Sequence, residues 1–297
     1  MRIRWRLGAL VCAVAGVAAA APAGADAAEL IGRNATQVKL AVSADGKALV
    51  SYVSGGRQHH TLAWGAINAI APTPSRPQVA LRLDYSGGWM SFRLKPATFR
   101  NRCAAYDGPK LAWAVAACKA PDGSYWALQT WQRALPNYGL AGTPFQRKYE
   151  LWVSHWKGPL PVLEVGLGWV QARFHTIFGR FTYLGKPIYG FGTGVNGRPT
   201  DSYGRVAYVD TWDSAYGSGW RRENSFVTHR GSGVFCYGFY PHGRHPSGKG
   251  TRYRITVQGP GVMPDMFWEG VPSSTYDKGF DTAQKQTLGS YGDPTCG

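Results

Sequence analysis

The dominant pattern along the chain is an alternation of apolar and polar positions with a period of two. The run 38–43 alternates in this way, Asp45-Gly46 follows, and a second alternating run covers 47–53. Two such runs around an Asp-Gly turn predict a β-hairpin. A second hairpin is predicted over 111–131, where two runs are joined by a Pro-Asp-Gly turn.

Short runs of the same kind recur along the whole chain. The strands we expect are 38–43, 47–53, 61–64, 79–85, 111–118, 125–131, 149–156, 162–170, 181–184, 188–191, 205–213, 234–240 and 253–258. Only 277–288 has a helical pattern, and 39 Gly and 19 Pro fit many turns. The sequence therefore predicts an all-β fold of sandwich-like antiparallel sheets, with long Gly/Pro-rich loops and one short C-terminal helix.

The N-terminal end departs from this pattern. Three arginines within the first six residues precede an apolar run over 7–21, and small-residue A-x-A sites lie at 23–25 and 25–27. These features are typical of a secretory signal peptide, and a retained membrane anchor is the alternative. We expect residues 1–27 to be the signal and 28–297 to be one β-rich domain, with a candidate sub-boundary at the Pro-rich segment 71–77.

No other long uncharged apolar run is present in the sequence. We therefore expect a secreted, extracellular or cell-wall-associated protein with no integral membrane segment after signal cleavage. Oligomeric state has no signature in the sequence.

The chain is strongly basic, with a formal net charge of +16. Without the three arginines of the signal it has 30 basic residues against 17 acidic ones, a net charge of roughly +13. Such a charge favours polyanionic partners, such as extracellular polysaccharide or an anionic cell-wall polymer. No run of five or more Lys/Arg is present, which excludes a dedicated polybasic arm.

Four cysteines remain after the signal: Cys103, Cys118, Cys236 and Cys296. An even number in an exported chain predicts two disulfides, for which three pairings exist. We favour Cys103–Cys118, which brackets one short segment, and Cys236–Cys296, which would tie the C-terminal tail to a strand.

Three stretches resemble uncharacterised exported proteins of actinobacterial type. They are Leu62-Ala-Trp-Gly-Ala66, Ala120-Pro-Asp-Gly-Ser-Tyr-Trp-Ala-Leu128 and Tyr208-Val-Asp-Thr211. The resemblance covers most of the chain after the signal; it implies export and implies nothing about activity.

A G-x-G-x-x-G motif is formed by Gly192, Gly194 and Gly197. As a dinucleotide fingerprint it would need a strand before it and a helix after it. The residues that follow include Arg198-Pro199 and have no helical period. We expect no nucleotide cofactor, and a glycine-rich loop over 192–204.

Signals for metal binding and for nucleophilic catalysis are weak. His242 and His245 form an H-x-x-H between two prolines, a spacing that fixes no ligand geometry on a loop, so we expect no metal site. There is no G-x-S-x-G motif. Cys236 with His229 imitates a catalytic pair, but export favours a disulfide role for this cysteine.

Two strand carboxylates are candidates for chemistry, and Glu150 is the first. Residues two apart in a strand share a face, so Glu150 lies with Trp152 and Trp156. Glu164 shares a face with Gly166 and Gly168, where missing side chains would leave room for a ligand.

Asp210 is the second carboxylate, and it shares a strand face with Tyr208 and Trp212. Asp213 falls on the opposite face if the strand stays extended. Aromatic rings beside a carboxylate suit a sugar, and the same residues also suit a β-sandwich core.

The segment 211–223 concentrates aromatic and cationic residues between glycines. We interpret it as an exposed loop that could bind sulfate, phosphate or carboxylate groups, or as a loop folded over the sandwich edge. The residues concerned are Trp212, Tyr216, Trp220, Arg221 and Arg222.

Three hypotheses of function follow. The leading one is an exported protein that binds an extracellular or cell-wall glycan, which we expect to be anionic, through the five residues of 211–223 together with Trp152, Trp156 and Tyr208. The alternative is a glycoside-cleaving hydrolase that uses Glu150 and Asp210 as paired carboxylates, with Glu223 or Glu164 as substitutes. The third is a structural envelope protein without a ligand site.

Overall fold

The computed structural model of the protein describes residues 28–70, 78–136, 140–170, 172, 174–188, 191–193, 199–201, 207–223, 226–229, 234–238, 250–271 and 276–291. Within these residues the secondary structure is almost entirely β, in four larger antiparallel sheets and one two-stranded ribbon. The prediction of an all-β, sandwich-like fold with one C-terminal helix is confirmed. The short helical turns are α1 (Trp89–Phe92), η1 (Pro96–Thr98) and η2 (Pro144–Arg147).

The N-terminal sheet has the order β2-β3-β4-β5. Its first two strands form the predicted hairpin around Asp45-Gly46, in which Ser43 and Lys47 are hydrogen-bonded and Gly46 adopts a φ of +77°. Glycine suits this position because a left-handed residue is needed to close the turn. The strands are β2 (Thr36–Val42), β3 (Ala48–Ser54), β4 (Arg57–Gly65) and β5 (Leu81–Asp84).

The central sheet has the order β1-β9-β8-β7-β6. One of its faces, which includes Trp126 and Leu128, packs against the N-terminal sheet in a core that also contains Val50. The strands are β1 (Glu29–Arg33), β6 (Ala104–Ala105), β7 (Ala114–Lys119), β8 (Tyr125–Trp131) and β9 (Glu150–Trp156).

Two further sheets build the other half of the molecule. The C-terminal sheet has the order β16-β15-β19-β20, with β15 (Ala207–Ser214), β16 (Gly217–Arg222), β19 (Arg252–Val257) and β20 (Met266–Gly270). The helix-facing sheet has the order β10-β11-β18-β17, with β12 beside β11. Its strands are β10 (Val162–Val170), β11 (Phe174–Tyr183), β12 (Lys186–Pro187), β17 (Phe226–His229) and β18 (Val234–Gly238).

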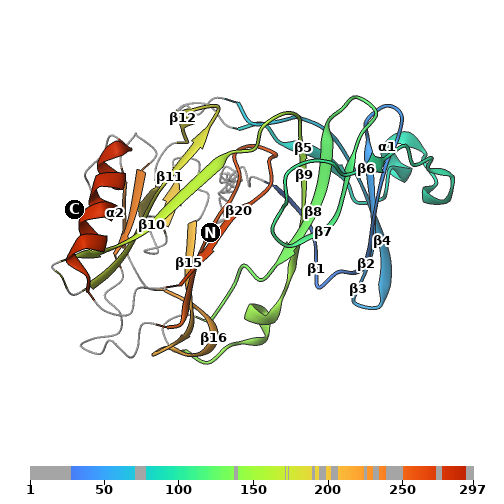
Figure 1. Cartoon of the computed structure of the whole chain (residues 1–297). Coiled ribbons are helices and arrows are strands. Elements are labelled where there is room, and N and C mark those ends of the chain that lie inside the picture. Colours follow the sequence, from blue (N-terminus) through green and yellow to red (C-terminus); the bar gives the residue numbers. More distant parts are fainter. Residues whose placement is uncertain are drawn as a thin grey trace, which may run out of the picture.

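The second face of the central sheet is covered as well. Ala127 and Trp156 belong to a core that includes Ile177 of β11 and Ile255 of β19, so the central sheet is packed on both sides. Figure 1 shows this arrangement, with β2 to β5 at one end, the central sheet in the middle and α2 at the other end. β9 is accordingly buried along almost its whole length.

Helix α2 (Lys278–Ser290) begins where the sequence predicts a helix. The Asp277 side chain accepts a hydrogen bond of 2.6 Å from the Phe280 backbone N–H, as expected of an N-cap. The helix packs on β10 and β11, where Leu288 and Phe178 form a small core cluster.

The disulfide Cys103–Cys118 is present, with 5.6 Å between the Cα atoms, and that prediction is confirmed. Cys236 lies in β18, but its side chain and Cys296 are outside the described residues, so the second disulfide stays a prediction. The predicted signal peptide and the segment 71–77 also lie outside them. Among the described residues, no helix has the length and apolar character needed to cross a membrane.

The glycine motif and the strand predicted at 188–191 need correction. Ile188 lies outside a strand, and β13 (Phe191–Thr193) pairs with β14 (Pro199–Asp201) instead. Gly192 is therefore paired in a β-ribbon opposite Thr200, and the expected continuous loop over 192–204 is interrupted by these two strands. Gly194 and Gly197 lie outside the described residues.

Candidate functional site: an arginine–tryptophan face

One face of the C-terminal sheet gathers arginine and aromatic side chains. We call it the arginine–tryptophan face and define it by Tyr208, Asp210, Trp212, Trp220, Arg222, Arg252 and Arg254. Cross-strand register places Trp212 opposite both Trp220 and Arg252, and Asp210 opposite both Arg222 and Arg254. The predicted grouping of Tyr208, Asp210 and Trp212 on one strand face agrees with this register.

The segment 211–223 is a hairpin, and the prediction of an exposed loop there is corrected. β15 continues to Ser214 and returns as β16 from Gly217. The turn is made possible by Gly217 and Gly219, whose φ angles are +124° and +72°. Asp213 breaks the extended register with a φ of +49°, and its carboxylate accepts a hydrogen bond from the Gly219 N–H.

Cations and rings are interleaved across the face. The Arg252 guanidinium lies 4.6 Å from the Trp212 ring centroid and 5.3 Å from that of Trp220. The Arg254 guanidinium lies 4.2 Å from the Trp220 centroid and 5.9 Å from that of Trp113. Such contacts hold the guanidinium planes against the indoles and fix the direction of their N–H donors.

The carboxylate of Asp210 is buried under this face and bonded on both sides. Its Oδ1 accepts from Arg222 Nε at 2.6 Å and its Oδ2 from Arg254 Nε at 2.9 Å. Arg222 also lies 3.9 Å from the Tyr208 ring centroid. Asp210 thus neutralises and orients two arginines, and it has no open edge toward solvent.

Glu150 lies at the start of β9, beside β1 and β8. Its carboxylate accepts from Arg33 Nε at 3.2 Å, and only 13% of its side chain is exposed. Of the substitutes, Glu223 is buried and accepts a hydrogen bond from the Thr211 hydroxyl. These contacts favour structural roles, and the paired-carboxylate hydrolase stays a prediction.

Trp152 and Trp156 lie in the core, contrary to the expectation that they face a ligand. Their exposed fractions are 1% and 0%. Both lie on the same face of β9, because they are four residues apart in a strand. The helix-facing and C-terminal sheets cover that face. Trp152 packs with Trp131 and Tyr208, where the central and C-terminal sheets meet.

The remaining predicted ligand residues are spread over the β15–β16 hairpin and do not all lie on one face. Trp212 and Trp220 are half-buried and form an edge-to-face pair with centroids 5.3 Å apart. Arg221 points to the other face, where its Nη1 donates to the Leu140 carbonyl at 3.0 Å. Tyr216 is half-buried in the turn and its N–H donates to Ser214 Oγ.

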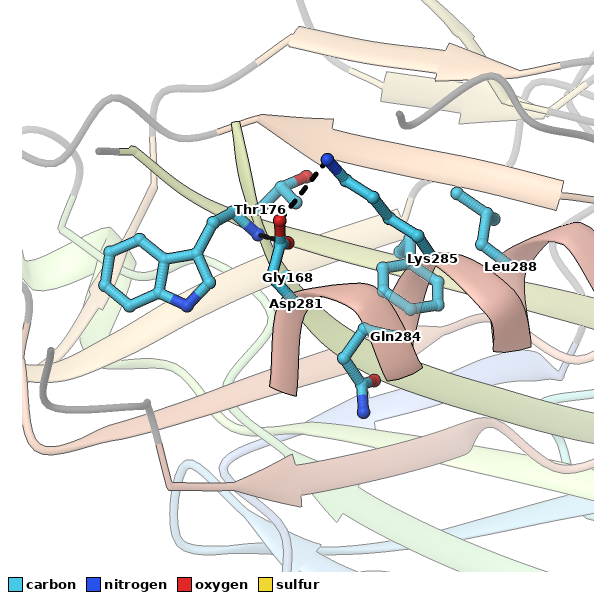
Figure 2. A pocket seen from close by; sticks show the side chains of 8 residues that line it. Gly168, Thr176, Asp281, Gln284, Lys285 and Leu288 are labelled. Atoms are coloured by element: carbon cyan, nitrogen blue, oxygen red, sulfur yellow. Dashed lines mark hydrogen bonds and ion pairs between the residues drawn. The ribbon is translucent and has the colours of Figure 1, made fainter. Parts of the chain in front are cut away.

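The space expected above Gly166 and Gly168 is filled. A Cβ added at Gly166 would lie 2.4 Å from the Phe178 ring and 2.9 Å from Gln284 of α2. Figure 2 shows the small pocket that remains between β10, β11 and the helix, with a volume of about 10 Å³. This volume holds at most one water molecule, so the glycines serve helix packing and not a ligand.

Asp281 holds the helix over this pocket through one contact with β10, and it also pairs with Lys285 within the helix. Its Oδ1 accepts from the Trp169 backbone N–H at 3.2 Å, and its Oδ2 lies 3.3 Å from Lys285 Nζ. Figure 2 shows both contacts as dashed lines. The helix is thus attached to β10 by a buried hydrogen bond as well as by apolar packing.

Replacing Gly166 with alanine should lower the free energy of unfolding by about 1–3 kcal/mol, because the added methyl overpacks the contact between β10 and α2. Gly289→Ala is the control, because Gly289 lies in helix α2, where nothing lies within 4 Å of an added Cβ. It should raise stability by about 0.5–1 kcal/mol. Urea titration of both variants measures the difference, and equal effects would contradict the packing argument.

Comparison of the chain with protein-family models, with curated proteins and with solved structures gave no match. We therefore infer function from the contacts of the described residues. Within these residues no group of three or more His, Cys, Asp or Glu is placed to hold a metal ion. His242 and His245 fall outside the described part of the chain.

Sequence reasoning missed Arg252 and Arg254, which complete the arginine–tryptophan face. The signal was present in the run Thr-Arg-Tyr-Arg-Ile-Thr-Val at 251–257, where two arginines alternate with apolar residues. The alternation predicts that both arginines share a face. It does not reveal that this face pairs with Trp212 and Trp220, because the partner strand is about forty residues away.

Proposed function

We propose that this exported protein binds an anionic extracellular or cell-wall glycan through the arginine–tryptophan face. The observation that carries the proposal is the position of Arg252, whose side chain is 43% exposed while its guanidinium lies over two indole rings. A cation and a flat apolar surface are thus offered side by side on one sheet.

The chemistry of such a surface suits a charged sugar. An indole ring packs on the C–H face of a pyranose, while a guanidinium donates to a carboxylate, sulfate or phosphate group. Arg252 is paired with Glu269 at 3.1 Å, and Glu269 is itself one-third exposed. Since a solvent-exposed ion pair is weak, an anionic ligand could take its place.

The charge of the whole chain supports the same proposal. Its net charge, +16 for the full sequence and roughly +13 without the predicted signal, raises the local concentration of polyanions and speeds encounter with them. The predicted signal peptide and the disulfide Cys103–Cys118 fit an oxidising, extracellular compartment. No described contact favours hydrolysis over binding, so we propose a binding protein.

Replacing Arg252 with glutamine should weaken binding to an anionic polysaccharide by about five- to tenfold, the loss of about 1 kcal/mol of cation contact. The measurement is retention on an insoluble acidic polysaccharide across a salt titration, beside its neutral counterpart. Retention of the variant on the neutral polymer should be unchanged.

Arg57→Gln is the matched control, because Arg57 is an exposed arginine at the start of β4 in the N-terminal sheet and does not belong to the arginine–tryptophan face. Both variants remove one charge, so a general effect of net charge would weaken both equally. Equal losses, or no retention of the parent protein at low salt, would overturn the proposed function.

A further inference from the structure

A second, larger cavity lies in the N-terminal half, away from the arginine–tryptophan face. It has a volume of about 450 Å³ and lies between the β2–β3 turn and the segment 92–102, with Leu62 of β4 in its wall. Pockets that bind small molecules have volumes of this order.

The lining of this cavity combines apolar and cationic side chains. The apolar part consists of Leu62, Phe92, Leu94 and Phe99, and the cations are Lys47, Arg100 and Arg102. The one acidic residue in the lining, Asp45, is already bonded to Lys47 and Ser43. Among the described residues, neither the Arg100 nor the Arg102 guanidinium makes a hydrogen bond or ion pair.

The cationic wall is held in place on two sides. The Arg102 N–H donates to the Val42 carbonyl, and the Asn101 side chain accepts from the backbone N–H groups of Val42 and Cys103. The disulfide Cys103–Cys118 then ties the same segment to β7. A wall fixed in this way loses little conformational freedom when a ligand binds.

The helical turn that contributes Phe92 to the cavity also carries exposed apolar side chains. Phe92 lines the cavity and ends α1, whose Met90 and Trp89 are 79% and 56% exposed. Exposed apolar side chains of this kind are typical of interaction and ligand-binding surfaces. The lining offers a sugar few free acceptors, because the Asp45 carboxylate is occupied.

We propose that this cavity binds a single-chain anionic amphiphile, such as a long-chain carboxylate. The hydrocarbon chain would contact Leu62, Leu94 and Phe99, and the head group would accept charge-assisted hydrogen bonds from Arg100 and Arg102. This site is separate from the proposed glycan face, and the two proposals stand or fall independently.

The test is calorimetric titration of the delipidated full chain with laurate below its micellar concentration. We expect saturable 1:1 binding, at least tenfold tighter than that of dodecanol and absent for acetate. The double variant R100Q/R102Q should bind laurate at least tenfold more weakly. Arg57→Gln, which changes an exposed arginine at the start of β4 that does not line the cavity, should bind laurate as the parent does.

Two further measurements separate the alternatives. Phe99→Ser should weaken the binding of laurate without changing the midpoint of thermal unfolding by more than a few degrees. Arg252→Gln should leave the binding of laurate unchanged. Equal binding of laurate by R100Q/R102Q and the parent would overturn the proposal. So would a preference of this cavity for acidic sugars, or binding to anionic phosphatidylglycerol vesicles without binding of free laurate.

Discussion

Replacing Asp210 with alanine should lower the free energy of unfolding by about 3–5 kcal/mol. The substitution leaves two largely buried guanidinium groups, those of Arg222 and Arg254, without their shared carboxylate. Breaking a buried ion pair by removing one partner carries a cost of this order because the remaining charge stays desolvated. Urea titration with a shared m-value measures the loss.

Glu269→Ala is the matched control, because Glu269 pairs with an arginine in the same sheet but is partly exposed. We expect a loss below about 1 kcal/mol, as for other surface ion pairs. Asp210→Asn should fall between the two, since it keeps the shape and removes the charge. A loss for Asp210→Ala no larger than that of the control would contradict the structural role assigned to Asp210.

Acidification from pH 7 to pH 4 should cost the parent protein about 3 kcal/mol of stability through His155 alone. This histidine is buried against Trp126, with 3.8 Å between ring centroids, and burial lowers its pKa from 6.5 to about 4. Its Nδ1 lies 3.0 Å from the Ala66 carbonyl and its Nε2 2.9 Å from the Ser124 hydroxyl, contacts that a neutral ring satisfies.

The direction of the effect follows from proton binding. Between pH 6.5 and 4 the unfolded chain protonates His155 while the folded chain does not, so stability falls as the pH falls through this window. Below pH 4 both states bind the proton and this contribution levels off. The lowered pKa values of Asp45 and Asp122 act mainly below the window, since carboxyl groups titrate near 3.8 when unperturbed.

The measurement is the free energy of unfolding at several pH values for the parent, His155→Gln and His59→Gln. His59 is exposed in β4, so its substitution leaves the hydrogen bonds of His155 intact. The loss of unfolding free energy between pH 7 and pH 4 should be smaller by about 3 kcal/mol in His155→Gln. In His59→Gln this loss should be the same as in the parent protein. The same slope in all three proteins would show that His155 is not the group responsible.

Period-two alternation located most strands of this fold. β8 and β10 have the predicted bounds, 125–131 and 162–170, because each is a long apolar run between clear turn signals. β16 was missed because Gly217-Ser-Gly-Trp-Arg-Arg has low intrinsic strand preference. It forms through pairing with β15 and through contacts with Arg252 and Arg254, which no local window contains.

The candidate site shows the same limit. The alternation of side chains along a strand predicted which residues share a face, such as Asp210 and Trp212. It did not predict which of these faces is covered by a second sheet. In the sequence, Trp152 and Trp156 appear as suited to contact a ligand as Trp212 and Trp220 do. Only the packing of the sheets shows that the first pair is buried. The cavity of about 450 Å³ in the N-terminal half had no signal in the sequence, because its walls come from the β2–β3 turn, β4 and the segment 92–102.

The central sheet, packed on both faces, limits how the chain can vary and where it can be divided. A strand such as β9 has no solvent side, so a polar residue on either of its faces needs a buried hydrogen-bond partner, as His155 has in Ser124 and the Ala66 carbonyl. Dividing the chain anywhere between β9 and β15 would leave one apolar surface of this sheet bare. The two halves of the molecule therefore depend on each other to bury this sheet and are constrained to be inherited as a unit.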